Sequence, residues 1–342
     1  MSHKVFGIDF GTDTLKIYEK GKGIIWNQKE LVAITIQQKD YTKKVKVPIE
    51  CGDYAYDMYE KAPDSIDVTF PLKHGVVADM EDMYCLWKCV AEHIPNKKHF
   101  KGGTFYIAVP PETNDVEKRA FYDLIMLSEI RARAAKLIDK PVVCGLGAGI
   151  PVTSTKGAIV VDLGAETTEI SILSTGGIVV NRLLPQGCKD VTDNIVNYIK
   201  KNYKFVVGWK SAELLRQKLL YAFPTEETMR VVGRNIVKGL PGTLELTSRE
   251  LFSLAEEYYS KILLTTKTML ERTPPEISAA IHQNGVYLTG GGACIPDMAK
   301  LFEQELGVPV ICGEEPQLAV IKGFEALLEN DKMSGFLESK TK

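Results

Sequence analysis

Two short turns in this chain are each flanked by apolar segments with the pattern of β-strands. The first copy is Gly7-Ile-Asp-Phe-Gly-Thr-Asp-Thr-Leu-Lys-Ile-Tyr18, and it returns as Val161-Asp-Leu-Gly-Ala-Glu-Thr-Thr-Glu-Ile-Ser-Ile172. In each copy an apolar strand ends in an acidic residue, a tight turn follows, and a second strand runs antiparallel to the first. A repeat nearly half a chain apart predicts a duplicated α/β unit with a cleft between its halves, where ligands usually bind.

The residue types of these turns suit phosphate chemistry. Backbone N–H groups and hydroxyls of such a turn point toward one spot, where they can bind phosphate oxygens. The aspartate before the turn can hold a hydrated Mg²⁺. One copy alone is more often a plain strand turn, but two facing copies would bind the phosphates of a nucleotide.

The remaining periodicity predicts alternating strands and helices. Residues from about 31 to 73 are expected to form a small inserted subdomain, and short strands within 228–246 a second one. Asn114 with Glu117, and Thr247 with Glu250, are capping signals for two of the helices. Helices are predicted at about 81–93, 114–127, 191–201, 211–220, 247–271, 295–306 and 317–328, with a short polar tail after the last one.

Composition narrows the class of protein. With 342 residues, 45% of them hydrophobic, the chain can bury two sizeable cores. Its net charge of −2 shows no excess of basic residues of the kind that binds nucleic acid. Neither a membrane-spanning run nor a signal peptide is apparent, so a cytoplasmic location is expected. The seven cysteines are scattered without zinc spacing. We expect no disulfides, and we interpret Cys85 and Cys89 as small core residues.

The two hairpins and Tyr287-Leu-Thr-Gly-Gly-Gly-Ala293 together resemble the nucleotide site of actin, DnaK-type chaperones and sugar kinases. Within this superfamily the chain is most similar to the MreB-type bacterial actins, over about residues 5–328. The resemblance implies an α/β, actin-like fold of two duplicated RNase H-like lobes with a nucleotide cleft between them. It implies lobe I at 1–148 plus 317–342 with a subdomain at about 31–73, and lobe II at 149–316 with a subdomain at about 186–249.

The resemblance also assigns roles to residues. ATP or ADP with Mg²⁺ would be the cofactor, and Asp9 and Asp162 would approach the ion through its waters. Glu213 and Arg216, on one helix face, match the family's ribose contacts, although an exposed helical ion pair is the alternative. The residues expected to bind the nucleotide are Asp9, Gly11, Thr12, Asp13, Thr14, Asp162, Gly164, Ala165, Thr167, Thr168, Glu213, Arg216, Gly290, Gly291, Gly292 and Ala293.

The chain departs from the family where the attacking water is positioned. MreB proteins have a Glu immediately before the proline at the end of the first half, and here Lys140 precedes Pro141. A lysine cannot accept a hydrogen bond from water, and losing a positioned acid or base costs roughly 10²- to 10⁴-fold in rate. Either Asp139 or Glu166 takes over this role, with Lys140 paired to one of them, or hydrolysis is slow or absent. Thr167 completes this set of catalytic candidates, and ATPase activity stays open.

By resemblance the chain would assemble head to tail into filaments that act in cell shape and wall organisation. Its partners would then be further copies of itself, membrane proteins of cell-wall synthesis and the anionic inner face of the membrane. The loop 96–103 places Phe100 among Lys97, Lys98 and Lys101, and each lysine could add about 1 kcal/mol near anionic lipid. A solvated loop is the alternative.

Other functions stay open on sequence grounds. One is a non-hydrolysing, nucleotide-gated paralogue that modulates another filament. Another is a chaperone-like or metabolite-sensing ATPase, or a sugar kinase. A kinase would need an aspartate base beside a sugar pocket, and a chaperone would need a client-binding domain after the nucleotide domain.

Overall fold

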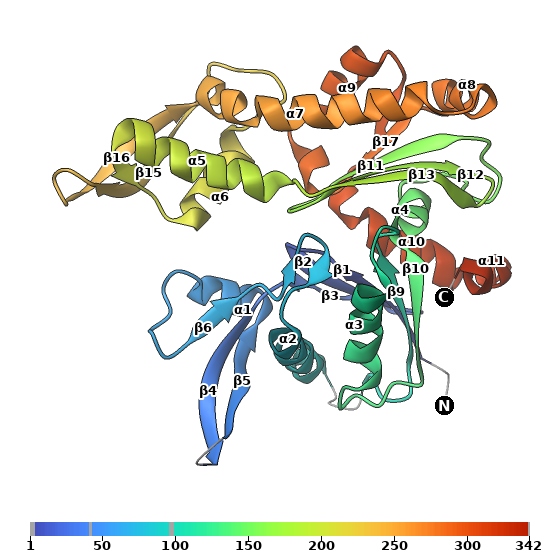
Figure 1. Cartoon of the computed structure of the whole chain (residues 1–342), viewed down its shortest axis with the longest axis horizontal. Helices are drawn as coiled ribbons and strands as arrows, with labels where there is room; N and C mark the ends of the chain where they lie inside the picture. The colour runs from blue at the N-terminus through green and yellow to red at the C-terminus, as the bar shows by residue number, and fades with distance from the viewer. Residues whose placement is uncertain (1–3, 41–42, 96–98, 341–342) are drawn as a thin grey trace. The chain divides into compact units, whose positions relative to one another are not determined.

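The computed structural model describes residues 4–40, 43–95 and 99–340. The chain forms two compact units, which are described separately here. Unit 1 comprises Met1–Thr153, Gly176–Asn181 and Leu318–Lys342, and unit 2 comprises Ser154–Thr175 and Arg182–Gln317. Figure 1 labels most of the helices and strands of both.

Unit 1 is built on a five-stranded sheet with the order β10-β9-β1-β2-β3. Strand β1 pairs antiparallel with β2 and parallel with β9, and β9 pairs parallel with β10. The central strands β1 and β9 are buried along nearly their whole length, as expected for a sheet covered on both faces. The strands are β1 (Val5–Phe10), β2 (Thr14–Glu19), β3 (Gly23–Lys29), β9 (Thr104–Val109) and β10 (Ala134–Asp139).

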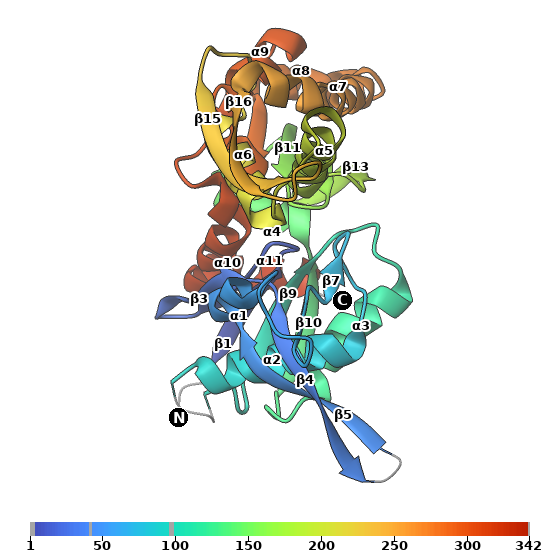
Figure 2. The ribbon, with the colours of Figure 1, turned by 90° about the vertical axis from the view of Figure 1, so that its left-hand side faces the viewer.

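Besides one short helix beside the smaller sheet, five helices lie in the described part of unit 1, and two of them meet at backbone contact. A Cβ atom on Gly147 would lie 1.7 Å from the carbonyl oxygen of Ala319, and one on Gly323 would lie 1.8 Å from that of Val143. Glycine is therefore required where α4 and α10 lie side by side (Figures 1 and 2). The helices are α2 (Met80–His93), α3 (Asp115–Met126), α4 (Lys140–Gly147), α10 (Ala319–Glu329) and α11 (Ser334–Lys340).

The short polar tail predicted after the last helix is wrong. The chain continues through a 3-10 turn, Asp331–Met333, into α11. Leu337 on this helix is buried, so the segment has an apolar anchor despite its polar composition. Packing of that one side chain is a tertiary effect that the local sequence pattern does not reveal.

The segment that follows β3 forms a smaller sheet, with the order β5-β4-β6, and one helix. Its own small core contains Leu31, Ala33 and Ala55. Figure 2 shows the long β4–β5 hairpin. The elements are β4 (Val32–Asp40), β5 (Lys43–Cys51), α1 (Gly52–Met58) and β6 (Asp67–Thr69), followed by the short pair β7 (Leu72–Lys73) and β8 (Val76–Val77).

Unit 2 repeats the topology of the first sheet. Its order is β13-β12-β11-β17-β18, in which β11 pairs antiparallel with β12 and parallel with β17, and β17 pairs parallel with β18. β11 thus corresponds to β1 and β12 to β2, which confirms the predicted duplication. The strands are β11 (Ala158–Leu163), β12 (Thr168–Ser174), β13 (Gly177–Leu184, which enters unit 2 at Arg182), β17 (Val286–Thr289) and β18 (Val310–Cys312).

Helices and a three-stranded sheet, β14-β15-β16, complete unit 2. The capping signals at Asn114 in unit 1 and Thr247 in unit 2 both form capping boxes, with Glu117 and Glu250. Nowhere in the described ranges does a helix have the length and hydrophobicity needed to cross a membrane. The elements are α5 (Cys188–Tyr203), β14 (Phe205–Val206), α6 (Trp209–Leu219), β15 (Thr228–Asn235), β16 (Pro241–Thr247), α7 (Ser248–Glu271), α8 (Pro275–Asn284) and α9 (Met298–Leu306), with 3-10 turns at Gly291–Cys294 and Pro316–Leu318.

Candidate functional site

The first hairpin carries Asp9 at the end of β1, opposite Lys16 in β2. Nζ of Lys16 lies 3.2 Å from Oδ2 of Asp9, and both side chains are more than 90% buried. A Cβ on Gly11 would lie 2.7 Å from the carbonyl oxygen of Thr14, so the turn accepts no larger residue without moving. Thr12 is buried beside it. The carboxylate is thus buried and held in place by its ion pair with Lys16.

A salt bridge ties the outer part of this turn to β3. Nζ of Lys29 lies 2.8 Å from Oδ1 of Asp13, and the N–H of Glu30 donates to the carbonyl oxygen of Asp13 at 2.8 Å. Thr14, which is half-buried, begins β2. The turn is therefore held from both strands that follow it.

The second hairpin has the same geometry in unit 2. Asp162 lies opposite Glu169 in the register that Asp9 has with Lys16, one residue before the strand ends. It is buried, and Oγ1 of Thr289 donates to its Oδ1 at 3.3 Å. A Cβ on Gly164 would lie 2.6 Å from the carbonyl oxygen of Thr167. The duplicated aspartate and glycine therefore occupy equivalent places in the two units.

The second turn also rests against the N-terminus of α5. The N–H groups of Cys188 and Lys189 donate to the carbonyl oxygens of Gly164 and Ala165, at 3.1 and 2.7 Å. A helix N-terminus carries a partial positive charge, so the potential at this turn favours an anion. Because α5 begins at Cys188, three residues before its predicted start, this arrangement was not anticipated from the sequence.

Lys189 is a functional candidate that sequence reasoning missed. Its Nζ lies 2.8 Å from Oε1 of Glu166, and both side chains are largely buried. The extra negative charge that Glu166 brings to the second turn is thus paired within unit 2. The sequence could have suggested Lys189 as a candidate, because it follows Gly187 closely and so falls in the first turn of the next helix.

The two threonines that follow Glu166 are both buried. Oγ1 of Thr168 donates to the carbonyl oxygen of Gln186 at 3.0 Å and lies 3.0 Å from the hydroxyl of Tyr258. Burial raises the pKa of the Tyr258 hydroxyl well above its ordinary value, so this group stays neutral. The hydroxyl of Thr168 thus stabilises the hairpin through contacts within unit 2. Thr167 is the last residue of the turn before β12 begins.

The triple-glycine turn packs directly on the second hairpin. Gly290 has a φ of 81°, and a Cβ there would lie 2.6 Å from Oδ1 of Asp162. A Cβ on Gly292 would lie 2.7 Å from that of Leu163, whereas one on Gly291 would meet nothing within 4 Å. Two of the glycines are therefore required for packing, and Gly291 leaves an open side next to the buried Ala293.

Glu213 and Arg216 lie on α6, but they are not the exposed ion pair that was the alternative interpretation. Glu213 is 5% exposed, and Nη2 of Arg216 lies 3.9 Å from its Oε1. Nε of Arg216 donates to Oγ1 of Thr192 on α5 at 3.0 Å. A buried, mutually oriented acid and base can accept and donate hydrogen bonds to a ligand, which an exposed pair does far less well.

Comparison with known proteins identifies the family. The sequence model of the MreB/Mbl protein family matches residues 3–335. This chain belongs to the MreB/Mbl family. Among its relatives, the cell shape-determining protein Mbl of Bacillus cereus is 35% identical over 326 residues, which cover 95% of each chain. The cell shape-determining protein MreB of Escherichia coli strain K12 is 31% identical over 335 residues, 96% of this chain and 94% of that protein.

Solved structures agree with the family assignment and establish the actin-like fold. The crystal structure of MreB5 of Spiroplasma citri bound to AMPPNP matches with a TM-score of 0.89 and 28% identity, covering 99% of both chains. The MamK double helical filament matches with a TM-score of 0.77 and 19% identity, covering 96% of this chain and 99% of that one, and this likeness concerns the fold.

The residues expected to position the attacking water lie at the junction of β10 and α4 in unit 1. Asp139 ends β10, and Lys140 and Pro141 begin α4. Asp139 and Lys140 are both half-buried. Glu166, the other candidate for positioning water, is bound to Lys189 in unit 2 as described above.

The loop considered for membrane contact is partly outside the described residues, since Lys97 and Lys98 are not described. Phe100 is described, and it is only 2% exposed. Its ring stacks on Trp87 at a centroid distance of 5.3 Å and an interplanar angle of 9°. The ring of Phe100 therefore fills the core of unit 1 and is not available to contact a membrane.

Proposed function

We propose that this chain binds Mg·ATP and Mg·ADP through its two hairpins and the 290–293 turn. The observation that carries the proposal is the repeat of a buried aspartate, at the same register, before a glycine turn in each unit. Carboxylate oxygens are the ligands that Mg²⁺ prefers, and the backbone N–H groups of a tight glycine turn can bind phosphate oxygens. MreB5 of Spiroplasma citri, solved with AMPPNP and with ADP, supports the proposal.

Each set of residues has its own proposed task. Asp9 and Asp162 would hold the waters of Mg²⁺, which supplies positive charge beside the phosphates. Glu213 and Arg216 would bind the ribose hydroxyls. The open side of Gly291 would leave room for the flat adenine ring, because a Cβ there meets no atom within 4 Å.

We further propose that ATP hydrolysis by this chain is slow. Lys140 stands where MreB proteins have the glutamate that positions the attacking water, and an ammonium group cannot accept a hydrogen bond from it. The ion pair between Glu166 and Lys189 restrains Glu166, so its carboxylate is a poor replacement. Nucleotide binding itself, more than turnover, would then select the conformation of the protein.

The chain is further proposed to assemble into actin-like filaments that act in cell shape and wall organisation. Its relatives Mbl and MreB carry the name cell shape-determining protein. The β15–β16 hairpin of unit 2 supports self-assembly, because Val232, Val237 and Leu240 are 70%, 80% and 62% exposed. Exposed apolar side chains gathered on one element mark interaction surfaces.

Lys140 also favours a second candidate function. A paralogue that binds nucleotide without hydrolysing it could join or cap filaments of another MreB. It would co-assemble with that protein and would not pellet alone.

The proposed role in wall organisation also implies contact with the membrane and with membrane proteins. With Phe100 in the core, contact with an anionic surface would depend on the lysines of the loop, of which Lys101 is exposed. Such contact would be weak and sensitive to salt. Membrane proteins of cell-wall synthesis would then provide the firmer attachment.

Nucleotide binding can be tested by thermal unfolding with and without Mg·ATP. A ligand at about 100 times its dissociation constant stabilises the native state by about 2.7 kcal/mol. Wild-type protein should therefore melt at a higher temperature with Mg·ATP than with ATP and EDTA. Asp162→Asn keeps the hydrogen bond from Thr289 and removes the charge, so it should lose the magnesium-dependent part of this shift.

Asp64→Asn, at an exposed position far along the chain from either hairpin, is the control and should behave as wild type. The proposal would be contradicted if Mg·ATP left the wild-type melting temperature unchanged. It would also be contradicted if Asp162→Asn kept the full magnesium dependence.

A further inference from the structure

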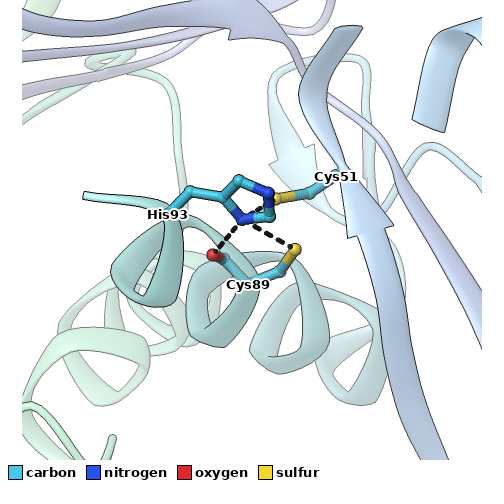
Figure 3. Close-up of side chains that lie close together, drawn as sticks. All are labelled: Cys51, Cys89 and His93. Atoms are coloured by element: carbon cyan, nitrogen blue, oxygen red, sulfur yellow. Dashed lines mark hydrogen bonds between the residues drawn. The ribbon is translucent and has the colours of Figure 1, made fainter. Parts of the chain in front are cut away.

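Two cysteines and a histidine from distant parts of the sequence meet in unit 1. Cys51 is the last residue of β5, while Cys89 and His93 lie one turn apart on α2. Nδ1 of His93 is 3.8 Å from Sγ of Cys51 and 3.6 Å from Sγ of Cys89. Figure 3 shows the imidazole beside the two thiols, and all three ligand atoms lie within 4.8 Å of one another.

These separations fit the size of a tetrahedral metal centre. Zinc binds cysteine sulfur at about 2.3 Å and histidine nitrogen at about 2.0–2.1 Å, so a tetrahedral angle sets sulfur and nitrogen about 3.6 Å apart. Both sulfur-to-nitrogen distances here are within 0.2 Å of that value. Two thiols and an imidazole form a soft donor set, which favours zinc over the hard ions Mg²⁺ and Ca²⁺.

We propose that Cys51, Cys89 and His93 bind one zinc ion, with a water molecule as the fourth ligand. The thiols would release their protons to solvent as they bind the ion. Cys51 and Cys89 are 0% and 4% exposed, so the sulfurs lie in a dry pocket. His93 is exposed on the outer side, which gives the ion a path of entry and leaves space for the water.

The residues around the imidazole are arranged as an outer shell. Oε2 of Glu50 lies 3.3 Å from Nε2 of His93, the ring nitrogen that is not the one measured to the thiols. This oxygen is buried and makes no hydrogen bond within the described part of the chain. A metal-bound histidine commonly donates its other N–H to a carboxylate, which fixes the ring orientation and the tautomer. Trp26 and Tyr54 flank the same ring, at centroid distances of 6.2 and 6.5 Å.

One hydrogen bond in the structure occupies the His93 nitrogen that would bind zinc. Nδ1 of His93 is also 3.0 Å from the carbonyl oxygen of Cys89, in the preceding turn of α2. Zinc binding would replace this contact with a metal bond. The exchange requires only a small rotation of an exposed side chain, so the helix itself can stay in place.

The site would have a structural effect within unit 1. Cys51 joins β5 to α1, and α2 packs against β5. Zinc would fasten the sheet β5-β4-β6 and α1 to α2 by a bond that spans 38 residues of sequence. None of the three ligands belongs to either hairpin or to the 290–293 turn, so the zinc site is independent of nucleotide binding.

Zinc binding can be measured on the untagged full-length chain. The background should carry Cys294→Ser and Cys312→Ser, because these two cysteines are outside the core and could bind zinc themselves. After loading with zinc and gel filtration, mass spectrometry should find one zinc per chain. Cobalt loading should give the intense visible absorption of a tetrahedral Co²⁺ site and a thiolate charge-transfer band in the near ultraviolet.

The variants separate a metal site from ordinary core cysteines. His93→Gln, at an exposed position, should lose the bound zinc without loss of fold, and Cys89→Ser should do the same if it folds. Cys85→Ser is the matched control, because Cys85 is buried on the same helix one turn earlier and its Sγ lies 3.7 Å from the carbonyl oxygen of Lys46. Glu50→Gln should keep one zinc but bind it about 10- to 100-fold more weakly.

Several results would overturn the proposal. One is a protein that binds no zinc after loading. Another is zinc that is retained in His93→Gln, or that Cys85→Ser loses as readily as His93→Gln does.

Discussion

Replacing Phe100 by alanine tests whether this residue belongs to the core or to a membrane-binding surface. Its side chain is 2% exposed and stacks on Trp87. It also meets the edges of Phe6 and Phe105, at centroid distances of 5.1 and 5.6 Å. Phe→Ala substitutions at such positions destabilise by about 3–5 kcal/mol, because the lost burial and the remaining cavity both contribute. The loss is a large share of a typical stability of about 5–15 kcal/mol.

Urea unfolding followed by tryptophan fluorescence would measure this loss. Trp26 and Trp87 are in unit 1 and Trp209 is in unit 2, so a Trp209→Phe background restricts the signal to unit 1. With a denaturant slope of about 2 kcal/mol/M, a loss of about 4 kcal/mol lowers the midpoint by about 2 M. Phe100→Leu keeps much of the volume and should give a smaller decrease in the same direction.

Lys101→Ala is the control for Phe100, because this neighbouring side chain is exposed and its removal should change stability by less than about 0.5 kcal/mol. The reasoning would be refuted if Phe100→Ala unfolded at the wild-type urea concentration while losing affinity for anionic vesicles. That pair of results would mean that the ring lies on the surface and contacts lipid.

Three further outcomes are expected. Gly323→Ala should lower the unfolding free energy of unit 1 by about 3 kcal/mol or more, because its Cβ would lie 1.8 Å from a carbonyl oxygen of α4. Gly335→Ala is the control and should leave this free energy unchanged, because a Cβ there would meet no atom within 4 Å. Equal urea midpoints for the two variants would contradict this prediction. Burial raises the pKa of Glu250, but hydrogen bonds led by that from Tyr203 outweigh it and lower the pKa overall. Glu250→Gln should therefore lower the free energy of unfolding by about 1 kcal/mol at neutral pH. The difference in stability between variant and wild type should vanish as pH falls through the lowered pKa of Glu250. A difference that persists in acid would show that the charge of Glu250 is not its cause. Lys140→Glu should raise phosphate release by roughly 10²- to 10⁴-fold, and no gain with intact ATP binding would disprove the assigned role of Lys140.

The parts of the fold that local chemistry determines were predictable from the sequence. The hairpin repeat appeared with the expected pairing because alternation and turn residues act over a few positions. The capping boxes at Asn114 and Thr247 formed for the same reason. Helix α8 was not predicted; it begins at Pro275, and proline is well tolerated in the first turn of a helix.

Features that depend on distant residues were not predictable. Phe100 looked like a loop aromatic among lysines, and only its packing on Trp87 and Phe6 places it in the core. Cys89 was correctly expected to be buried. Its approach to Cys51 requires β5 to pack on α2, which no spacing rule in the sequence reveals. The pairing of Lys189 with Glu166 likewise depends on where α5 begins.

The assignment of this chain as a nucleotide-dependent actin-like polymer is tested most directly by measuring sedimentation and phosphate release together. The samples would contain Mg·ATP, a non-hydrolysable ATP analogue with Mg²⁺, or no nucleotide. We predict that the protein pellets with either nucleotide, releases little phosphate, and stays in the supernatant without nucleotide. Failure to pellet under any of these conditions, despite tight ATP binding, would contradict the assignment and favour a nucleotide-gated partner of another filament.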